Sequence, residues 1–313
     1  MGFKIVFMGT PDFAVPSLKM LIDHAYDVAA CFAQPDRKAG RGYKMVMPPV
    51  KALALEHGIL VHQPEKVSGE EGVALLRAIQ PDVMVTAAYG QILSEEVLAI
   101  PRLGCINVHA SLLPKLRGAA PVQWAIINGE KKTGVTTMYT VKKLDAGDIL
   151  EQDEVRIPDD MTAGELYDLL SVVGAGTLRR TLEKLKEGTL ARRPQDEAEA
   201  TYYPMFPKGF GKVDFTKQRS EIENFVRGTN PVPGAYVMYG DEKIKVYAVS
   251  PVDGVGNGAA AGEIVAVNPK EGLLVKAADG VLSIDQIKRQ GAKQMGAKES
   301  LRGKKLDVGY VFD

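Results

Sequence analysis

The chain has 313 residues, of which 45% are hydrophobic and 25% charged, an ordinary composition for a globular protein with room for two domains. No run approaches the roughly 18 apolar residues of a membrane-spanning helix, so we expect no membrane partner. Basic and acidic residues balance at 39 each, which argues against a uniformly basic nucleic-acid-binding protein but leaves room for local patches.

The first part of the chain alternates apolar strands with helices. Strands are predicted at residues 4–8, 28–32 and 81–88, and helices from Pro11, with Thr10 as N-cap, and at 50–57 and 69–79. This alternation is typical of βαβ units and predicts an α/β fold with a Rossmann-like, mainly parallel sheet. The turn after the first strand has one glycine, Gly9, where a dinucleotide-binding loop has Gly-x-Gly-x-x-Gly, which argues against an NAD enzyme.

Residues 104–118, GCINVHASLLPKLRG, join a short strand with polar side chains at its carboxyl end to a loop. A strand is predicted at 105–109 because apolar and β-branched residues dominate it. Side chains alternate along a strand, so Asn107 and His109 should lie on one face, roughly 7 Å apart. Pro114 cannot continue a central strand, so the chain should leave the sheet there. Open α/β sheets place their ligand crevices at such strand ends, and we predict the functional site here.

The rest of the chain divides at a segment without periodicity. Strands at 134–141 and 148–157 should pair, with Asp145 in the loop between them, and Thr162 with Glu165 forms a capping box that begins a long helix. Residues 191–208 are predicted to be a linker. Beyond them, turn signals separate five short strands, which indicates a small β-barrel: 234–239, 243–250, 262–267, 272–277 and 281–288.

Three motifs together resemble those of the folate-dependent formyltransferases: Asn-x-His-x-Ser-Leu-Leu-Pro at 107–114, Arg-Gly-Ala-Ala-Pro at 117–121 and Leu-Asp-Ala-Gly-Asp at 144–148. The resemblance covers nearly the whole chain and is greatest to the members that formylate methionyl initiator tRNA. It implies a catalytic domain with a folate site at 1–190, and an OB-like barrel with a tRNA contact at 209–313.

The resemblance also implies a reaction, in which a formyl group passes from 10-formyltetrahydrofolate to the amino group of methionyl-tRNA without a metal. Asn107 would hydrogen-bond the developing oxyanion, and His109 would donate to it or assist proton transfer. Asp145 would orient His109 and favour its charged form. The folate site would include the loop Ser111, Leu112, Leu113 and Pro114, and a pterin-pocket wall formed by Tyr89, Gly90, Gln91, Ile92 and Leu93.

Two stretches concentrate positive charge. In the glycine-rich loop at 34–44, the resemblance implies that four residues contact the acceptor end of the tRNA, namely Arg37, Lys38, Arg41 and Lys44. The stretch from Lys288 to Lys305 contains seven Lys and Arg residues and a single acid, Glu299. This basic stretch is a second possible polyanion contact.

The cysteines and the N-terminal residues narrow the choice of chemistry and of cellular location. Cys31 and Cys105 lie in apolar runs and are predicted to be buried and reduced, and no spacing of His, Cys and Asp suggests a metal site. The first ten residues resemble a strand rather than a signal peptide, so we expect a cytoplasmic protein. We also expect a monomer.

Alternatives to the formylation of methionyl-tRNA are a formyltransferase for an amino sugar nucleotide or glycinamide ribonucleotide, and a non-enzymatic tRNA-binding protein. The intact Asn107, His109 and Asp145 argue against the last.

Overall fold

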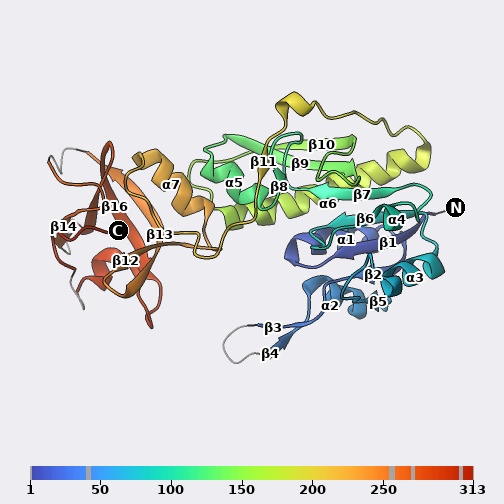
Figure 1. Ribbon diagram of the computed structural model, residues 1–313, viewed down its shortest axis with the longest axis horizontal. Helices are drawn as coiled ribbons and strands as arrows, with labels where there is room; N and C mark the ends of the chain where they lie inside the picture. Colours follow the sequence, from blue (N-terminus) through green and yellow to red (C-terminus); the bar gives the residue numbers. More distant parts are fainter. Residues whose placement is uncertain (1, 40–43, 254–257, 269–271, 303–305, 313) are drawn as a thin grey trace. The chain divides into compact units, whose positions relative to one another are not determined.

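The computed structural model describes residues 2–39, 44–253, 258–268, 272–302 and 306–312 (Figure 1). The chain forms two compact units. The first comprises residues 1–121, 132–156 and 167–204, and the second comprises residues 122–131, 157–166 and 205–313. Among the helices in these described ranges, none is long and apolar enough to cross a membrane.

A seven-stranded sheet forms the centre of the first unit, in the order β10-β9-β7-β6-β1-β2-β5. Five neighbouring strands are parallel, and β9 and β10 are antiparallel at one edge, so the predicted mainly parallel sheet is confirmed. Its strands are β1 (Lys4–Gly9), β2 (Asp27–Phe32), β5 (Val61–His62), β6 (Val83–Ala87), β7 (Cys105–His109), β9 (Lys132–Tyr139) and β10 (Ile149–Arg156).

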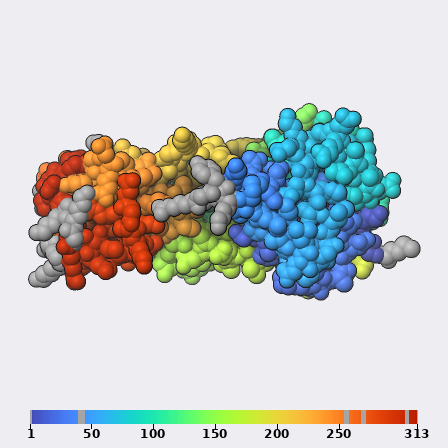
Figure 2. All heavy atoms as spheres, turned by 90° about the horizontal axis from the view of Figure 1, so that it is seen from below, coloured from blue at the N-terminus to red at the C-terminus, as the bar shows by residue number. Residues whose placement is uncertain are grey.

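Helices cover this sheet, as parallel strands buried on both faces require. Alternate residues of the central strands, such as Val6 and Met8, form an apolar core with residues of α3 and α4. In Figure 2 the atoms of the N-terminal segments, blue to cyan, form one closely packed body. The helices are η1 (Asp12–Ala14), α1 (Val15–Asp23), α2 (Pro49–Glu56), α3 (Glu70–Ile79), α4 (Glu95–Leu98) and α6 (Ala163–Glu187), whose residues 167–187 belong to this unit.

The first helix begins later than the sequence predicts. A 3₁₀ turn over residues 12–14 precedes α1, and Thr10 is not its N-cap. Instead, the Thr10 hydroxyl donates to the backbone carbonyl of Tyr89 at 2.9 Å and accepts from the backbone N–H of Gln34 at 3.2 Å. Three strand ends meet at this point, so tertiary hydrogen bonds replace the local cap.

Much of the predicted linker packs on the first unit. Residues 197–199 form the 3₁₀ helix η2 (Glu197–Glu199), and β11 (Tyr202–Tyr203) pairs in parallel with β8 (Arg117–Gly118). A Cβ atom at Gly118 would lie 2.4 Å from the Tyr203 carbonyl oxygen, so this approach requires glycine. Strand pairing satisfies the backbone of a segment that has no apolar periodicity of its own.

The second unit contains an antiparallel sheet in the order β12-β13-β16-β15-β14, and β17 pairs with β16. Apolar side chains from β12 to β16 and from the helices α7 and α8 share one core. The sequence predicts a small β-barrel here, and the structure confirms an antiparallel β domain built from the five predicted strands. Its elements are α7 (Arg219–Gly228), β12 (Ala235–Tyr239), β13 (Glu242–Val252), β14 (Ile264–Asn268), β15 (Gly272–Ala277), β16 (Gly280–Lys288), β17 (Met295–Gly296) and α8 (Ala297–Ser300). The unit also takes in most of α5 (Pro121–Ile127), whose Trp124 ring lies 5.1 Å from that of Phe206.

Candidate active site

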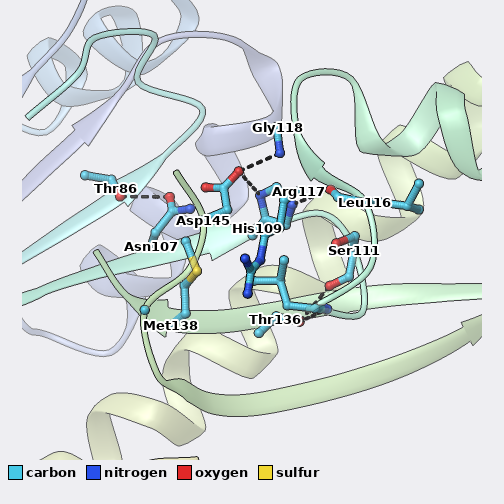
Figure 3. A network of polar contacts seen from close by, with 12 residues as sticks. Thr86, Asn107, His109, Ser111, Leu116, Arg117, Gly118, Thr136, Met138 and Asp145 are labelled. Carbon is cyan, nitrogen blue, oxygen red and sulfur yellow. Dashed lines mark hydrogen bonds and ion pairs between the residues drawn. The ribbon is translucent and has the colours of Figure 1, made fainter. Parts of the chain in front are cut away.

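Asn107 is oriented by the neighbouring strand. β6 and β7 pair in parallel with Thr86 beside Asn107, and the Thr86 hydroxyl donates to Asn107 Oδ1 at 2.8 Å (Figure 3). Because the amide oxygen is the acceptor in this bond, the Asn107 Nδ2 group is the part of the side chain that can donate to a ligand.

His109 ends β7 and is buried, with its two ring nitrogens facing different partners (Figure 3). Nε2 lies 3.0 Å from the Leu116 carbonyl oxygen. A carbonyl can only accept, so Nε2 carries a hydrogen, and Nδ1 is the acceptor nitrogen of the neutral ring. Nδ1 faces Asp145 Oδ2 at 3.8 Å, and the same oxygen accepts the Gly118 N–H at 2.8 Å. The fold thus brings an amide donor, an imidazole and a carboxylate together.

Half of the side chains in the loop at 111–114 are buried and therefore not accessible to a ligand. Ser111 is fully buried and its hydroxyl donates to the Lys115 carbonyl at 2.7 Å, while Leu113 packs against Met138 and Ile149. Leu112 and Pro114 are half-buried. A folate on this loop would therefore meet mainly backbone groups and the latter two side chains.

The segment 89–93 follows β6 and divides into buried and exposed residues. Tyr89 and Leu93 belong to the core beneath α3 and α4, and burial raises the pKa of Tyr89. Gln91 is committed to the backbone, since it accepts the Val67 N–H at 2.7 Å and donates to the Pro64 carbonyl at 3.1 Å. The exposed members of the predicted pocket wall are Gly90 and Ile92, the latter 90% exposed.

A cavity of about 550 Å³ lies beside this segment. Its lining comes from the chain after β1, β2 and β6, from residues 37 and 46–48 and from the start of α2, and most of it is apolar. The lining residues are Thr10, Pro11, Gln34, Pro35, Arg37, Val46, Met47, Pro48, Pro49, Ala88, Tyr89 and Gly90. The carboxyl ends of neighbouring parallel strands therefore build a pocket of ligand size, as this class of sheet favours.

The basic loop includes a hairpin, β3 (Arg37–Ala39) paired with β4 (Lys44–Val46), which extends away from the sheet in Figure 1. Arg37 and Lys38 are exposed, and Lys44 begins β4. Arg41 lies outside the described residues.

A partly buried network of hydrogen bonds anchors the residue that precedes this hairpin, Asp36. The Lys51 ammonium donates to both oxygens of Asp36 at 2.8 and 2.9 Å and to Gln63 Oε1 at 2.7 Å. Hydrogen bonds from Lys51 and Gln63 hold the pKa of the Asp36 carboxyl below its usual range.

The site also contains residues to which the sequence assigns no role. Arg117 is fully buried, and although burial opposes its charge, hydrogen bonds to Glu197 and Tyr202 raise its pKa. Hydrogen bonds from Arg117 and Lys143 lower the pKa of Glu197 to about 2. The motif at 117–121 marks Arg117, but the segment that supplies Glu197 and Gln195 carries no periodicity that could reveal them.

Metal and thiol chemistry find no support in the described ranges. No group of three His, Cys, Asp or Glu side chains gathers there as metal ligands would. Cys31 and Cys105 are buried in β2 and β7, and burial raises the pKa of each thiol to about 12, which suppresses the reactive thiolate.

Comparison with known proteins agrees with this architecture. The model of the family "Formyl transferase" matches residues 3–182, and that of "Formyl transferase, C-terminal domain" matches residues 206–305. The methionyl-tRNA formyltransferase of Ruminiclostridium cellulolyticum is 50% identical over 98% of both chains, and that of Acetivibrio thermocellus is 49% identical over 99% of both. The solved structure of WlaRD, a sugar 3N-formyl transferase, matches 94% of this chain and 100% of its own with a TM-score of 0.69 at 18% identity. The chain therefore belongs to the formyl transferase family, in the branch of the methionyl-tRNA formyltransferases.

Proposed function

We propose that this protein transfers the formyl group of 10-formyltetrahydrofolate to the free amino group of methionyl initiator tRNA. The observation that carries the proposal is the arrangement of Asn107, His109 and Asp145 at the end of β7, in a chain about half identical to methionyl-tRNA formyltransferases along its whole length. The product would be the formylmethionyl-tRNA used in translation initiation.

The reaction exchanges one carbon–nitrogen bond for another. The acceptor amine forms a bond to the formyl carbon, the bond from that carbon to the folate nitrogen breaks, and a proton passes from the amine to the folate. We assign the stabilisation of the charged formyl oxygen to Asn107 Nδ2, because Thr86 already occupies Oδ1. We assign the proton transfer to His109 Nδ1, because Leu116 holds Nε2. Asp145 stabilises the ring when Nδ1 is protonated.

A reduced folate as formyl donor has independent support. WlaRD, which shares this fold, was solved in the presence of 5-N-formyl-THF. In this chain we place the folate between the backbone of the 111–114 loop and the exposed Gly90 and Ile92, since the other side chains of segment 89–93 are buried or bonded. The folate would supply the activated formyl group.

We place the tRNA acceptor end on the β3–β4 hairpin. Arg37, Lys38, Arg41 and Lys44 would bind phosphates, and Arg37 also lines the apolar cavity. The cavity is large enough for the methionyl group or the terminal nucleoside. In this scheme residues 1–190 are the catalytic domain, 191–208 the connection, and 209–313 an accessory tRNA-binding module.

One assay distinguishes this reaction from its alternatives. Purified protein with labelled 10-formyltetrahydrofolate is offered methionyl-tRNA, glycinamide ribonucleotide and an amino sugar nucleotide in parallel. We expect label in the methionyl-tRNA alone. Label in either small nucleotide would support the corresponding alternative, and binding of tRNA without transfer would indicate a non-enzymatic tRNA-binding protein.

We further propose that the protein is a monomer in the cytoplasm. The proposed acceptor is used by ribosomes in that compartment. Light scattering at working concentration should give the mass of one chain.

A further inference from the structure

Asp145 has a backbone conformation that other contacts must hold. Its φ of 47° lies in the left-handed region, which is unfavourable for a residue with a Cβ atom and persists only where the surroundings fix it. The Gly118 N–H fixes the carboxylate, but it does not fix the backbone.

The Ala146 N–H closes the local turn by donating to the Lys143 carbonyl at 3.3 Å, and the side chain of Gln195 adds tertiary hydrogen bonds to this turn. Its Nε2 donates to the carbonyl oxygens of Asp145 at 2.8 Å and Gly147 at 2.7 Å, and its Oε1 accepts from Arg117 Nε at 3.0 Å and Nη2 at 2.8 Å. These four bonds use both hydrogens and both lone pairs of the amide. A flipped amide would turn its oxygen toward two carbonyls and its hydrogens toward a cation, so one orientation is specified.

Arg117 provides a rigid anchor for Gln195. Its guanidinium is fully buried, donates to both oxygens of Glu197 at 3.0 and 3.2 Å, and also donates to the Tyr202 hydroxyl. Its backbone N–H donates to the Thr201 carbonyl at 2.9 Å. Side chain and backbone are thus tied to the same segment that carries Gln195.

The geometry therefore assigns a role to Gln195. The distance of 3.8 Å between Asp145 Oδ2 and His109 Nδ1 exceeds a hydrogen bond, so small movements of the Asp145 loop decide whether the two groups interact. We propose that Gln195, anchored by Arg117, is a positioning residue that holds the Asp145 carboxylate facing His109 during formyl transfer. This inference rests on the reaction proposed above.

The test removes the amide at constant length with Gln195→Met. Gln218→Met is the matched control, because Gln218 precedes α7 in the other unit and contributes to capping that helix. Formylation of methionyl-tRNA is measured first with the wild-type protein, so that a failure of the proposed function is seen independently. For Gln195→Met we expect kcat to fall about 10- to 100-fold with KM for both substrates unchanged, since misplacement by about 1 Å has effects of this size. Gln218→Met should keep the wild-type kcat.

Two further measurements separate positioning from general stability. In an Asp145→Asn background, Gln195→Met should cause little additional loss, because residues that act through one group are non-additive. The pH profile of kcat should change in Gln195→Met but not in Gln218→Met. If Gln195→Met does not fold, Gln195→Glu keeps an acceptor for Arg117 and replaces the donor with a carboxylate oxygen that faces the Asp145 and Gly147 carbonyls, with the same expectation. A wild-type kcat, or an equal loss with and without Asp145, would overturn the proposal.

Discussion

At the residue scale, the site depends on the hydrogen bonds that orient its side chains, one from a neighbouring side chain and two with backbone groups, rather than on unusual residue types. Thr86 orients Asn107, Leu116 orients His109, and Gly118 orients Asp145. Each of these three side chains thus has one polar atom held by a hydrogen bond within the fold. This is the preorganisation through which enzymes stabilise developing charge.

The first prediction concerns Asn107 and its partner. Asn107→Ala should lower kcat roughly 10²- to 10³-fold if Nδ2 is an oxyanion donor. Thr86→Val keeps the shape but removes the hydrogen bond to Oδ1, so it should lower kcat about fivefold, in line with about 1 kcal/mol for one hydrogen bond. Initial rates at saturating substrates give both values.

Thr133→Val on β9 is the matched control. The Thr133 hydroxyl is buried and has no hydrogen-bond partner among the described residues, so its removal should leave kcat unchanged. Equal losses in the Thr86 and Thr133 variants would mean that the loss reflects the sheet, and wild-type activity of Asn107→Ala would contradict the oxyanion role.

The second prediction concerns pH and Glu197. Its pKa in the folded protein, about 2, lies below the ordinary value of 4.5 because Arg117 and Lys143 donate to the carboxylate. Because the pKa is lower in the folded protein, the ionised Glu197 stabilises the fold fully above pH 4.5, and this stabilisation is lost as the pH falls toward 2. The difference in melting temperature between wild type and Glu197→Gln should therefore be largest near neutral pH and shrink below pH 4.5.

Glu183→Gln serves as the comparison, since the contact of Glu183 with Arg179 is a longer one, 3.8 Å, on the surface. Its melting temperature should stay close to that of the wild type across the same pH range. A pH-independent difference for Glu197→Gln would show that its ion pairs do not stabilise the fold.

At the scale of elements, charge along the sequence is a poor guide to charge available for binding. Arg289 belongs to the basic stretch 288–305, yet it is buried and paired with Glu242 at 2.6 Å. The cations of the β3–β4 hairpin, in contrast, include Arg37 and Lys38, which are exposed. Exposure alone does not decide between the two stretches, because Lys288, Lys293, Lys298 and Arg302 are exposed as well. We favour the hairpin because Arg37 also lines the cavity beside segment 89–93.

The third prediction concerns this hairpin. Affinity for methionyl-tRNA should fall as salt rises, and Arg37→Ala should reduce the log–log slope by about one, the effect of one lost phosphate contact. Arg41→Lys should be a poor substitute for Arg41, because a guanidinium binds phosphate or a base edge with two hydrogen bonds. Binding across a salt series measures both effects.

Arg77→Ala on α3 is the control of equal charge. Arg77 is exposed and pairs with Glu96 on the surface of the same unit, so this variant should keep the wild-type slope. Folate affinity should be the same in all variants. A parallel loss of folate and tRNA binding would indicate misfolding, and no loss of tRNA binding would remove the hairpin from the interface.

At the scale of the whole molecule, the fourth prediction concerns the ligand that stabilises the fold. A ligand that binds only the native state raises stability by about 2.7 kcal/mol at a hundred times its dissociation constant. A reduced folate should therefore raise the melting temperature, whereas NAD should not, because the turn after β1 has only Gly9 where a dinucleotide site has three glycines. A shift with NAD and none with folate, in parallel thermal scans, would support an oxidoreductase instead.

The sequence alone determined the features that short-range patterns encode. Alternating strands and helices predicted the parallel sheet, and the residues 105–109 match β7 at both ends. The capping box of Thr162 and Glu165 is present, with the Thr162 N–H donating to Glu165 Oε2 at 2.8 Å. Such features depend on neighbours within about one turn of chain, so periodicity and residue type suffice to predict them.

Only the tertiary structure decided which groups meet. Leu113 is buried, Thr10 binds distant backbone rather than a helix, and Gln195 reaches from an aperiodic segment to the loop of Asp145. These contacts join residues tens of positions apart, and they depend on strand register and on the path of irregular chain. Neither is encoded in a local pattern, because a backbone without periodicity takes its conformation from the surface on which it packs.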